Sequence, residues 1–238
     1  MKSSSAIKLT VALIVQARLS SSRFPGKVLE KITSSENVLS YLLKRLSRCK
    51  RVDKIIVATT TSSKDDLLEK YLTQNNYLVY RGSEVNCLER YYEAAKQHKA
   101  DVVIRITADC PLVIPEVVDE MVAYYLINYK SIDYLSNRQY TNFPEGVDVE
   151  VFGSKNLKKA IKSKLRKEEC EHINYYFLNR SAKYRIRYYN HTLGGDYSRF
   201  KLSIDTPEDL DKIRQLLKKN RLCLNFTLSD LIAALNTE

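Results

Sequence analysis

The sequence contains few of the residues from which metal centres and cross-linked scaffolds are built. Its 238 residues include five cysteines and three histidines. The cysteines are widely spaced, odd in number and lack C-x-x-C spacing, which excludes a disulfide framework and a zinc-ribbon pattern. The histidines also lie far apart in the chain, which argues against a zinc-dependent catalytic site.

Long apolar runs are missing as well. No segment approaches the roughly 18 consecutive apolar residues that a membrane-spanning helix needs. The apolar run at 11–15 is too short for the core of a signal peptide. The hydrophobic fraction of 44% is nevertheless ordinary for a folded protein. We therefore expect a cytoplasmic protein without a membrane partner.

Negative charge is in deficit. Lysine and arginine number 39 against 28 acidic residues, which gives a formal net charge of +11. An excess of this size suits a polyanionic ligand, either a nucleic acid or a nucleotide with its phosphates. The basic residues are spread over several segments, so a general effect on solubility accounts for most of them equally well.

Strand and helix patterns alternate through the first half. Continuous apolar runs predict buried strands, and apolar residues at helical spacing predict the helices between them. The expected strands are 11–15, 53–59, 77–81 and 101–107, and the expected helices are 37–50, 65–74, 85–99 and one beginning at Pro115. Ser63 is a candidate cap for the second helix, and Val85 is expected to face inward from the third. This order predicts an α/β fold with a mostly parallel central sheet flanked by helices.

The second half is less regular. Its expected strands are 133–137, 147–152, 185–189 and 200–204, and its expected helices are 155–165, 168–179, one from Pro207 and 228–235. We interpret the chain as one domain, 1–238, in which about 133–192 forms a smaller extension for acceptor binding or dimerisation. In such a sheet, ligands bind beyond the carboxyl ends of the strands. The polar loops at Arg18, Thr60, Ser83 and Asp109 are expected to meet there.

A cationic loop follows the first predicted strand. It contains Arg18, Arg23 and Lys27 together with three consecutive serines at 20–22. Arginine, lysine, hydroxyl and backbone N–H groups are the donors that bind phosphate. The loop is not a P-loop, because the G-x-x-x-x-G-K-[ST] pattern is absent. From its residues alone, a solvated basic loop is an equally good interpretation.

Two carboxylates directly follow predicted strands, Asp109 and Asp205. Magnesium in nucleotide sites takes one or two carboxylates together with phosphate oxygens and water. Each aspartate also has an ordinary structural interpretation. Asp109 can be a turn residue before Cys110 and Pro111, and Asp205 or Thr206 can cap the helix that starts at Pro207.

The loop at 17–27 fits the pattern A-R-x-x-S-x-R-x-P-G-K, and 204–210 reads I-D-T-P-E-D-L. Together these motifs resemble the sugar-acid cytidylyltransferases, which include the CMP-KDO and CMP-sialic acid synthetases, and most closely the SpsF-like branch. Gln16 departs from the pattern, since the KDO enzymes have proline there. The resemblance covers roughly residues 8 to 215. Supporting matches, in the family's order, lie at 57–60, 81–83, 90–92, 105–112, 146–152 and 171–172.

The resemblance implies a GT-A/Rossmann-like nucleotidyltransferase fold that uses CTP and Mg²⁺. It implies that Asp109 and Asp205 bind the metal, and that Arg18 and Lys27 oppose the charge that grows on pyrophosphate. These four residues are the expected catalytic set. The residues expected to hold CTP are Ala17, Arg18, Ser21, Arg23, Lys27, Thr60, Ser83 and Arg90.

The acceptor is expected in the second half. Asp148 and Glu150 are two apart in a predicted strand and therefore share a face, where they either contact sugar hydroxyls or face solvent. Glu171 and His172 are further candidates, although a histidine on a helix is more often structural. Arg185 and Arg187 also share a face and could meet an anionic group of the acceptor.

The predicted function is transfer of CMP from CTP to an acidic sugar or phosphorylated acceptor, with release of pyrophosphate. The family suggests a role in surface polysaccharide synthesis, such as that of the spore coat, and a homodimer. No nucleic-acid partner is expected. Two alternatives stay open. One is a GT-A-like glycosyltransferase, which usually carries a D-x-D motif that 109–111 lacks. The other is a non-catalytic protein that binds nucleotides or nucleic acid.

Overall fold

Strand β1 (Val11–Gln16) lies inside the central sheet, hydrogen-bonded to a parallel neighbour on each side. The computed structural model describes residues 8–237. Val11, Leu13 and Val15 face one hydrophobic cluster, whereas Ala12 and Ile14 face a second one. Both faces of the strand are therefore covered, which is why its sequence is continuously apolar.

Within residues 8–237 the sheet has seven strands in the order β3-β2-β1-β4-β6-β5-β7. The first four strands in sequence are parallel to one another, as expected. β6 pairs antiparallel with β4 and β5, and β7 is parallel to β5. The remaining strand bounds are β2 (Lys54–Thr60), β3 (Leu78–Gly82), β4 (Val102–Thr107), β5 (Tyr134–Ser136), β6 (Glu150–Gly153) and β7 (Ile186–Tyr188). The predicted α/β class with a mostly parallel sheet is confirmed.

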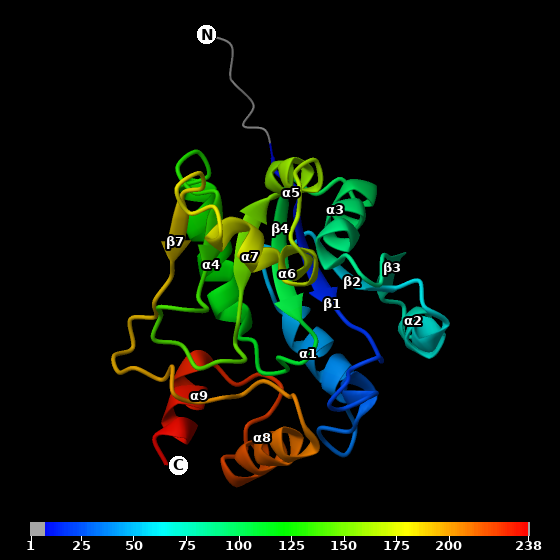
Figure 1. Cartoon of the computed structure of the whole chain (residues 1–238). Coiled ribbons are helices and arrows are strands. Elements are labelled where there is room, and N and C mark those ends of the chain that lie inside the picture. The colour runs from blue at the N-terminus through cyan, green and yellow to red at the C-terminus, as the bar shows by residue number, and fades with distance from the viewer. Residues whose placement is uncertain (1–7, 238) are drawn as a thin grey trace.

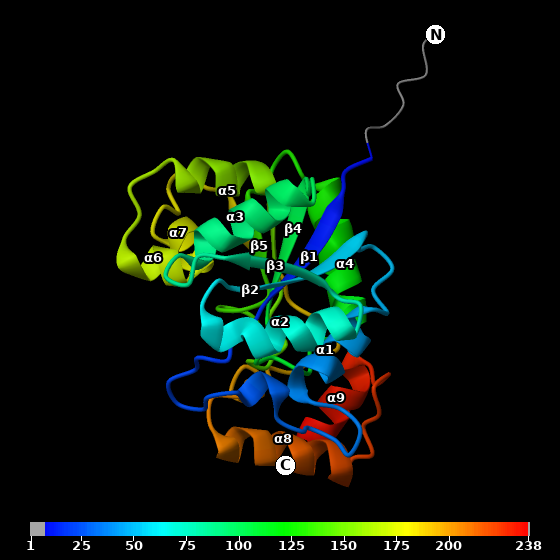
Figure 2. The same ribbon diagram turned by 90° about the vertical axis from the view of Figure 1, so that its right-hand side faces the viewer.

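Helices cover both faces of this sheet (Figures 1 and 2). The larger cluster is formed with α1 (Val38–Leu46), α2 (Asp66–Gln74), α4 (Pro115–Ile127), α8 (Pro207–Lys219) and α9 (Leu228–Leu235). The second cluster, on the other face, is formed with α3 (Cys87–Gln97), α5 (Ser154–Ile161) and α7 (Ile173–Leu178). α6 (Lys167–Glu171) packs beside α3 and leads into α7.

Three of the predicted helices differ from the structure in detail. The helix predicted at 85–99 begins at Cys87, and Val85 is 83% exposed rather than inward-facing, because it precedes the helix. The helix predicted at 168–179 breaks at His172, whose φ of −122° and ψ of 102° are extended. Ser63 is not the cap of α2; that position belongs to Asp65, after a short 3₁₀ turn.

The strand predicted at 200–204 is wrong as a regular strand. Its alternating pattern instead reflects an extended segment that buries Leu202 and Ile204 and makes one isolated bridge, between Lys201 and Glu145. Gly146, with φ of +99°, allows the approach, since a Cβ there would lie 2.4 Å from the carbonyl carbon of Leu202. The segment therefore runs directly beside the 145–147 loop.

The segment at about 133–192 contributes β5, β6 and β7 to the same sheet and packs α5 and α7 against it. In residues 8–237, no helix is long and apolar enough to cross a membrane.

Candidate active site

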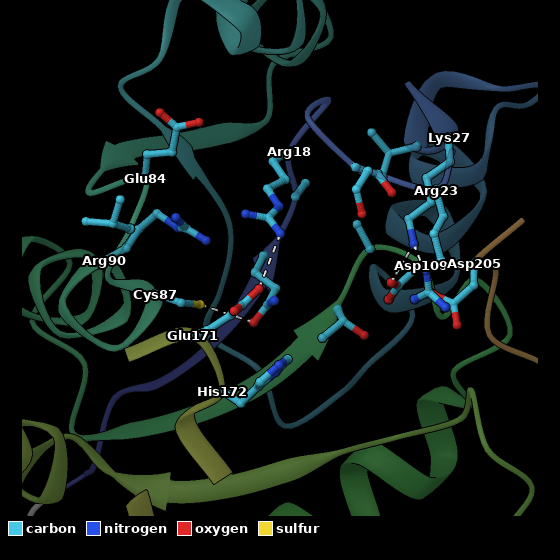
Figure 3. A pocket seen from close by; sticks show the side chains of 18 of the residues that line it. Arg18, Arg23, Lys27, Glu84, Cys87, Arg90, Asp109, Glu171, His172 and Asp205 are labelled. Carbon is cyan, nitrogen blue, oxygen red and sulfur yellow. Dashed lines mark hydrogen bonds and ion pairs between the residues drawn. The ribbon is translucent and has the colours of Figure 1, made fainter. Parts of the chain in front are cut away.

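A pocket of about 630 Å³ opens at the carboxyl ends of β1 and β4 (Figure 3). Ten of the fourteen predicted site residues line it: Ala17, Arg18, Ser21, Arg23, Lys27, Arg90, Asp109, Glu171, His172 and Asp205. Four predicted residues do not: Thr60, Ser83, Asp148 and Glu150. Residues far apart in the sequence therefore meet at the predicted edge of the sheet.

Lys27 lies at the centre of one side of the pocket. It starts the short 3₁₀ helix η1 (Lys27–Leu29), and its side chain is only 10% exposed. Its ammonium nitrogen lies 2.8 Å from Oδ2 of Asp109 and 3.7 Å from Oδ1 of Asp205. It also donates to the carbonyl oxygen of Ile204 at 2.6 Å. One buried cation thus joins two carboxylates.

Lys27 keeps Asp109 ionised. Burial raises the pKa of Asp109, but the charge and the hydrogen bond of Lys27 outweigh burial, so the pKa lies below its usual value. At neutral pH this carboxyl is an anion inside the pocket.

Asp205 is surrounded by positive charge. Its oxygens lie 2.7 Å from Nη2 of Arg23 and 3.2 Å from Nζ of Lys201, in addition to Lys27. Thr206, rather than Asp205, caps α8, because its hydroxyl accepts from the backbone N–H of Asp209. The Asp205 side chain is therefore left to the pocket, where its carboxylate faces the cationic loop (Figure 3).

The backbone brings the two aspartates together. The N–H of Ile204 donates to the carbonyl oxygen of Asp109 at 2.8 Å. The close approach at Gly146 holds the preceding residues of the same segment. Asp205 consequently arrives beside Asp109 on an extended segment.

This pair fits a divalent cation. Both carboxylates contact the ammonium group of Lys27, and magnesium in nucleotide sites takes one or two carboxylates and completes its shell with phosphate oxygens and water. Within residues 8–237, no cluster of three or more carboxylate, histidine or cysteine side chains could hold a metal by itself. A metal at this site would therefore need ligands from the nucleotide.

The cationic loop has a buried anchor that its sequence did not reveal. Asp65 is fully buried and accepts a hydrogen bond from the N–H of Leu19 at 2.7 Å. It also accepts from the hydroxyl of Thr60. Thr60 is itself fully buried and supports this anchor, so it does not line the pocket as expected. Asp65 is the first of two adjacent aspartates after the polar loop, and nothing in that pattern signals this role.

The other side of the pocket is formed by α3 and α6. Arg18 Nη2 lies 3.6 Å from Oε1 of Glu171, at the end of α6. His172 follows at the helix break, and burial lowers its pKa, which favours a neutral imidazole at pH 7. Arg90 donates to the carbonyl oxygen of Ser83 at 2.6 Å. Ser83 contacts the pocket wall through this backbone oxygen, and its hydroxyl accepts from the backbone N–H of Asn86 in the turn before α3.

Glu150 does not reach the pocket. It is 1% exposed, and its Oε1 accepts from Nη1 of Arg105 at 2.6 Å. Helices cover the strand at Glu150, so this side chain does not face solvent and is not among the residues that line the pocket. Asp148 precedes β6 in a separate cavity of about 280 Å³, 3.3 Å from Nε of Arg138. Burial raises the pKa of Asp148 to about 6.

The arginines expected to meet the acceptor also lie elsewhere. Arg185 forms an ion pair with Asp133 at 2.9 Å, and the Arg187 side chain donates to the carbonyl oxygen of Ile186. Neither lines the pocket. The pocket residues that were not among the predicted site residues are Gln16, Ser22, Val28, Glu84, Val85, Cys87, Thr107, Ala108 and Lys167.

The sheet order, the cationic loop and the paired aspartates define the class of nucleotidyltransferases. The fold resembles that of CMP-2-keto-3-deoxy-manno-octonic acid synthetase in complex with CTP, with a TM-score of 0.66 at 16% identity over 88% of this chain and 99% of that one. A cytidylyltransferase from Leptospira borgpetersenii matches with a TM-score of 0.90 at 31% identity over 97% and 95% of the two chains.

Residues 12–229 match the family model described as cytidylyltransferase, and the chain belongs to that family. The spore coat polysaccharide biosynthesis protein SpsF of Bacillus subtilis is 30% identical over 95% of this chain and 94% of its own length. The predicted family is therefore confirmed, and the chain is a CTP-dependent nucleotidyltransferase.

Proposed function

We propose that this protein transfers CMP from CTP to an acidic sugar or a related acceptor and releases pyrophosphate. The observation that carries the proposal is the position of Lys27 between Asp109 and Asp205, with Arg18 and Arg23 on the same pocket. This arrangement combines cations for a triphosphate with carboxylates for a divalent metal ion.

The cationic loop binds the triphosphate in this proposal. Arg18, Arg23 and Lys27 supply charge, and Ser21 supplies a hydroxyl at the pocket wall. Asp109 and Asp205 would hold Mg²⁺, which would neutralise charge on the phosphate oxygens.

The reaction needs no protein nucleophile. An acceptor oxygen attacks the α-phosphorus of CTP and forms a new P–O bond, and its proton passes to solvent. The bond between the α-phosphorus and the bridging oxygen breaks, and pyrophosphate leaves in line with the attack. Lys27 and Arg18 stabilise the charge on the leaving pyrophosphate, and the protein contributes chiefly by orienting the two reactants.

The acceptor lies beside α6. Glu171 and His172 end this helix at the pocket, and Lys167 adds a cation that suits the carboxylate of an acidic sugar. The name of the Bacillus subtilis relative favours a role in surface polysaccharide synthesis, such as that of the spore coat. We further propose that the enzyme works in the cytoplasm, as a homodimer formed through the segment at about 133–192.

The test is pyrophosphate release from each of the four nucleoside triphosphates, with Mg²⁺ and a panel of acidic sugars and phosphorylated acceptors. We expect release only with CTP and only with an acidic sugar or a related acceptor. A panel in which no acceptor stimulates release from any nucleotide would overturn the proposal. Release that accompanies transfer to a neutral acceptor would overturn the acceptor class alone.

A further inference from the structure

The side chain of Gln16, the last residue of β1, is held by two donors. Its Oε1 lies 3.2 Å from Nε of Arg105 and 3.4 Å from Sγ of Cys87, and each is a donor. An arginine Nε–H can only donate, so the oxygen and not the amino group of the Gln16 amide must face it. The orientation of the amide is thereby determined.

Arg105 is itself fixed. It is 4% exposed, and it forms an ion pair with Glu150, its cross-strand partner in the register of β4 and β6. Burial lowers the pKa of Arg105, but the charge of Glu150 outweighs burial and raises it overall. The guanidinium therefore stays charged and cannot become an acceptor. Glu150, Arg105 and Gln16 form a chain of contacts that runs from the buried strand face to the pocket.

The amino group of Gln16 is available to donate a hydrogen bond to a ligand in the pocket. Gln16 lines the pocket, and no acceptor within residues 8–237 takes a hydrogen bond from its Nε2. Gln16 contacts Cys87, which lies with Arg90 across the pocket from Lys27 and Asp109 (Figure 3). If the triphosphate occupies the Lys27 side, the nucleoside extends toward Cys87 and Gln16.

We propose that Gln16 selects cytosine over uracil, and that Arg105 is the positioning residue that orients it. This inference rests on the proposed binding of CTP with its phosphates at Lys27. Cytosine presents two adjacent acceptors, O2 and N3, whereas uracil carries a hydrogen on N3. The amino group of Gln16 is placed at N3 in this proposal, because O2 is an acceptor in both bases. A donor at N3 is complementary to cytosine, but it meets the N3–H donor of uracil.

The experiment compares the binding of CTP and UTP by titration calorimetry in the presence of Mg²⁺ and without an acceptor. In Gln16→Met, which removes the amide at similar length, the preference for CTP over UTP is expected to fall about 10-fold to 100-fold. In Gln16→Glu, the carboxylate pairs with Arg105 and presents only acceptors, so the preference is expected to shift further toward UTP. Gln97→Glu, an exposed residue at the end of α3, is the matched control.

Arg105→Lys tests the positioning role. Lysine keeps a charge for Glu150 but lacks the Nε donor that orients the amide. We expect the ratio of the CTP affinity to the UTP affinity to fall in this variant. In the double mutant, Gln16→Met should lower this ratio little further. A purely structural role would lower the melting temperature and weaken both nucleotides equally.

Three outcomes separate the possibilities. An unchanged CTP-to-UTP ratio in both Gln16 variants overturns the inference, even if the enzyme is active. If calorimetry shows no change in either nucleotide affinity while the pyrophosphate-release assay shows a raised acceptor KM, Gln16 contacts the acceptor, and this also overturns the inference. A wild-type protein that binds no nucleoside triphosphate contradicts the proposed function itself, on which the inference rests.

Discussion

The ammonium nitrogen of Lys27 lies 2.8 Å from a carboxylate oxygen of Asp109, although 82 positions separate the two residues in the chain. The pair stands at the edge of the sheet where the cationic loop meets the end of β4. Lys27 is nearly buried and is held further by the carbonyl oxygen of Ile204. Its charge is therefore oriented before a ligand binds, which is the condition for effective electrostatic stabilisation.

Replacing Lys27 by methionine is expected to lower the rate of pyrophosphate release about 100-fold to 1,000-fold, because the positive charge that stabilises the leaving pyrophosphate is removed. The rate is measured at saturating CTP and Mg²⁺. Lys212→Met, an exposed lysine on α8, serves as the control and should keep the wild-type rate. A Lys27→Met enzyme with full turnover would remove this residue from the catalytic set.

Asp205→Asn is expected to reduce turnover at least about 100-fold while the melting temperature changes by no more than about 2 °C. The carboxylate contacts pocket and loop cations, and α8 is capped by Thr206, so folding does not depend on its charge. Glu208→Gln makes the same chemical change on the exposed first turn of α8 and should leave turnover intact.

A magnesium titration makes the Asp205 test specific. The activity that remains in Asp205→Asn should require a higher Mg²⁺ concentration for half-saturation than the wild type. If the variant shows the wild-type magnesium dependence, Asp205 is not a metal ligand, whatever its effect on the rate.

Glu150→Gln is expected to destabilise the fold rather than to weaken the acceptor. Removing one partner of a buried ion pair leaves Arg105 without its counter-charge, which costs on the order of 3 kcal/mol in the free energy of unfolding. Urea unfolding measures this loss, and Glu168→Gln, at an exposed position of α6, is the control. Wild-type stability combined with a raised acceptor KM would return Glu150 to the substrate site.

The carboxyl of Asp148 is expected to make stability depend on pH. Its pKa is raised to about 6 by burial, from a usual value of 3.8. Between these values the folded state binds more protons than the unfolded state, so the free energy of unfolding falls as pH rises through this window. The expected total is up to about 3 kcal/mol.

Asp148→Asn should remove this slope and leave the variant more stable than the wild type above about pH 6, because the amide carries no charge to desolvate. Urea unfolding at several pH values from about 4 to about 7 measures the difference. Glu30→Gln, at an exposed carboxyl, should keep the wild-type slope. A slope that persists in Asp148→Asn would assign it to other groups.

The sequence predicted the first half of the fold well, because local patterns determine it. Buried parallel strands such as β1 are continuously apolar, and helices such as α1 carry apolar residues at helical spacing. The segment at 200–204 was read wrongly because alternation also arises in an extended loop that buries two side chains. The break at His172 was missed because no proline or glycine marks it in the sequence of 167–178.

The candidate site was also predictable only in part. Motifs placed Arg18, Lys27, Asp109 and Asp205, which do line one pocket. Spacing placed Glu150 on a strand face, but it could not say whether solvent or a helix covers that face. Thr60 was likewise chosen as a loop residue, whereas packing buries it against Asp65.

By itself, the sequence determined the alternation of strands and helices and the cationic loop after β1. It also determined that Asp109 follows β4 and that Asp205 follows the extended segment at 200–204. These are local properties of residue type and spacing. Only the tertiary structure decided that Lys27 lies between Asp109 and Asp205 and that Glu150 forms a buried ion pair with Arg105. It also decided that the amide oxygen of Gln16 contacts Arg105, which leaves the amino group facing the pocket. The physical reason is that such pairings depend on burial and on contacts between residues distant in the chain, which no local pattern encodes.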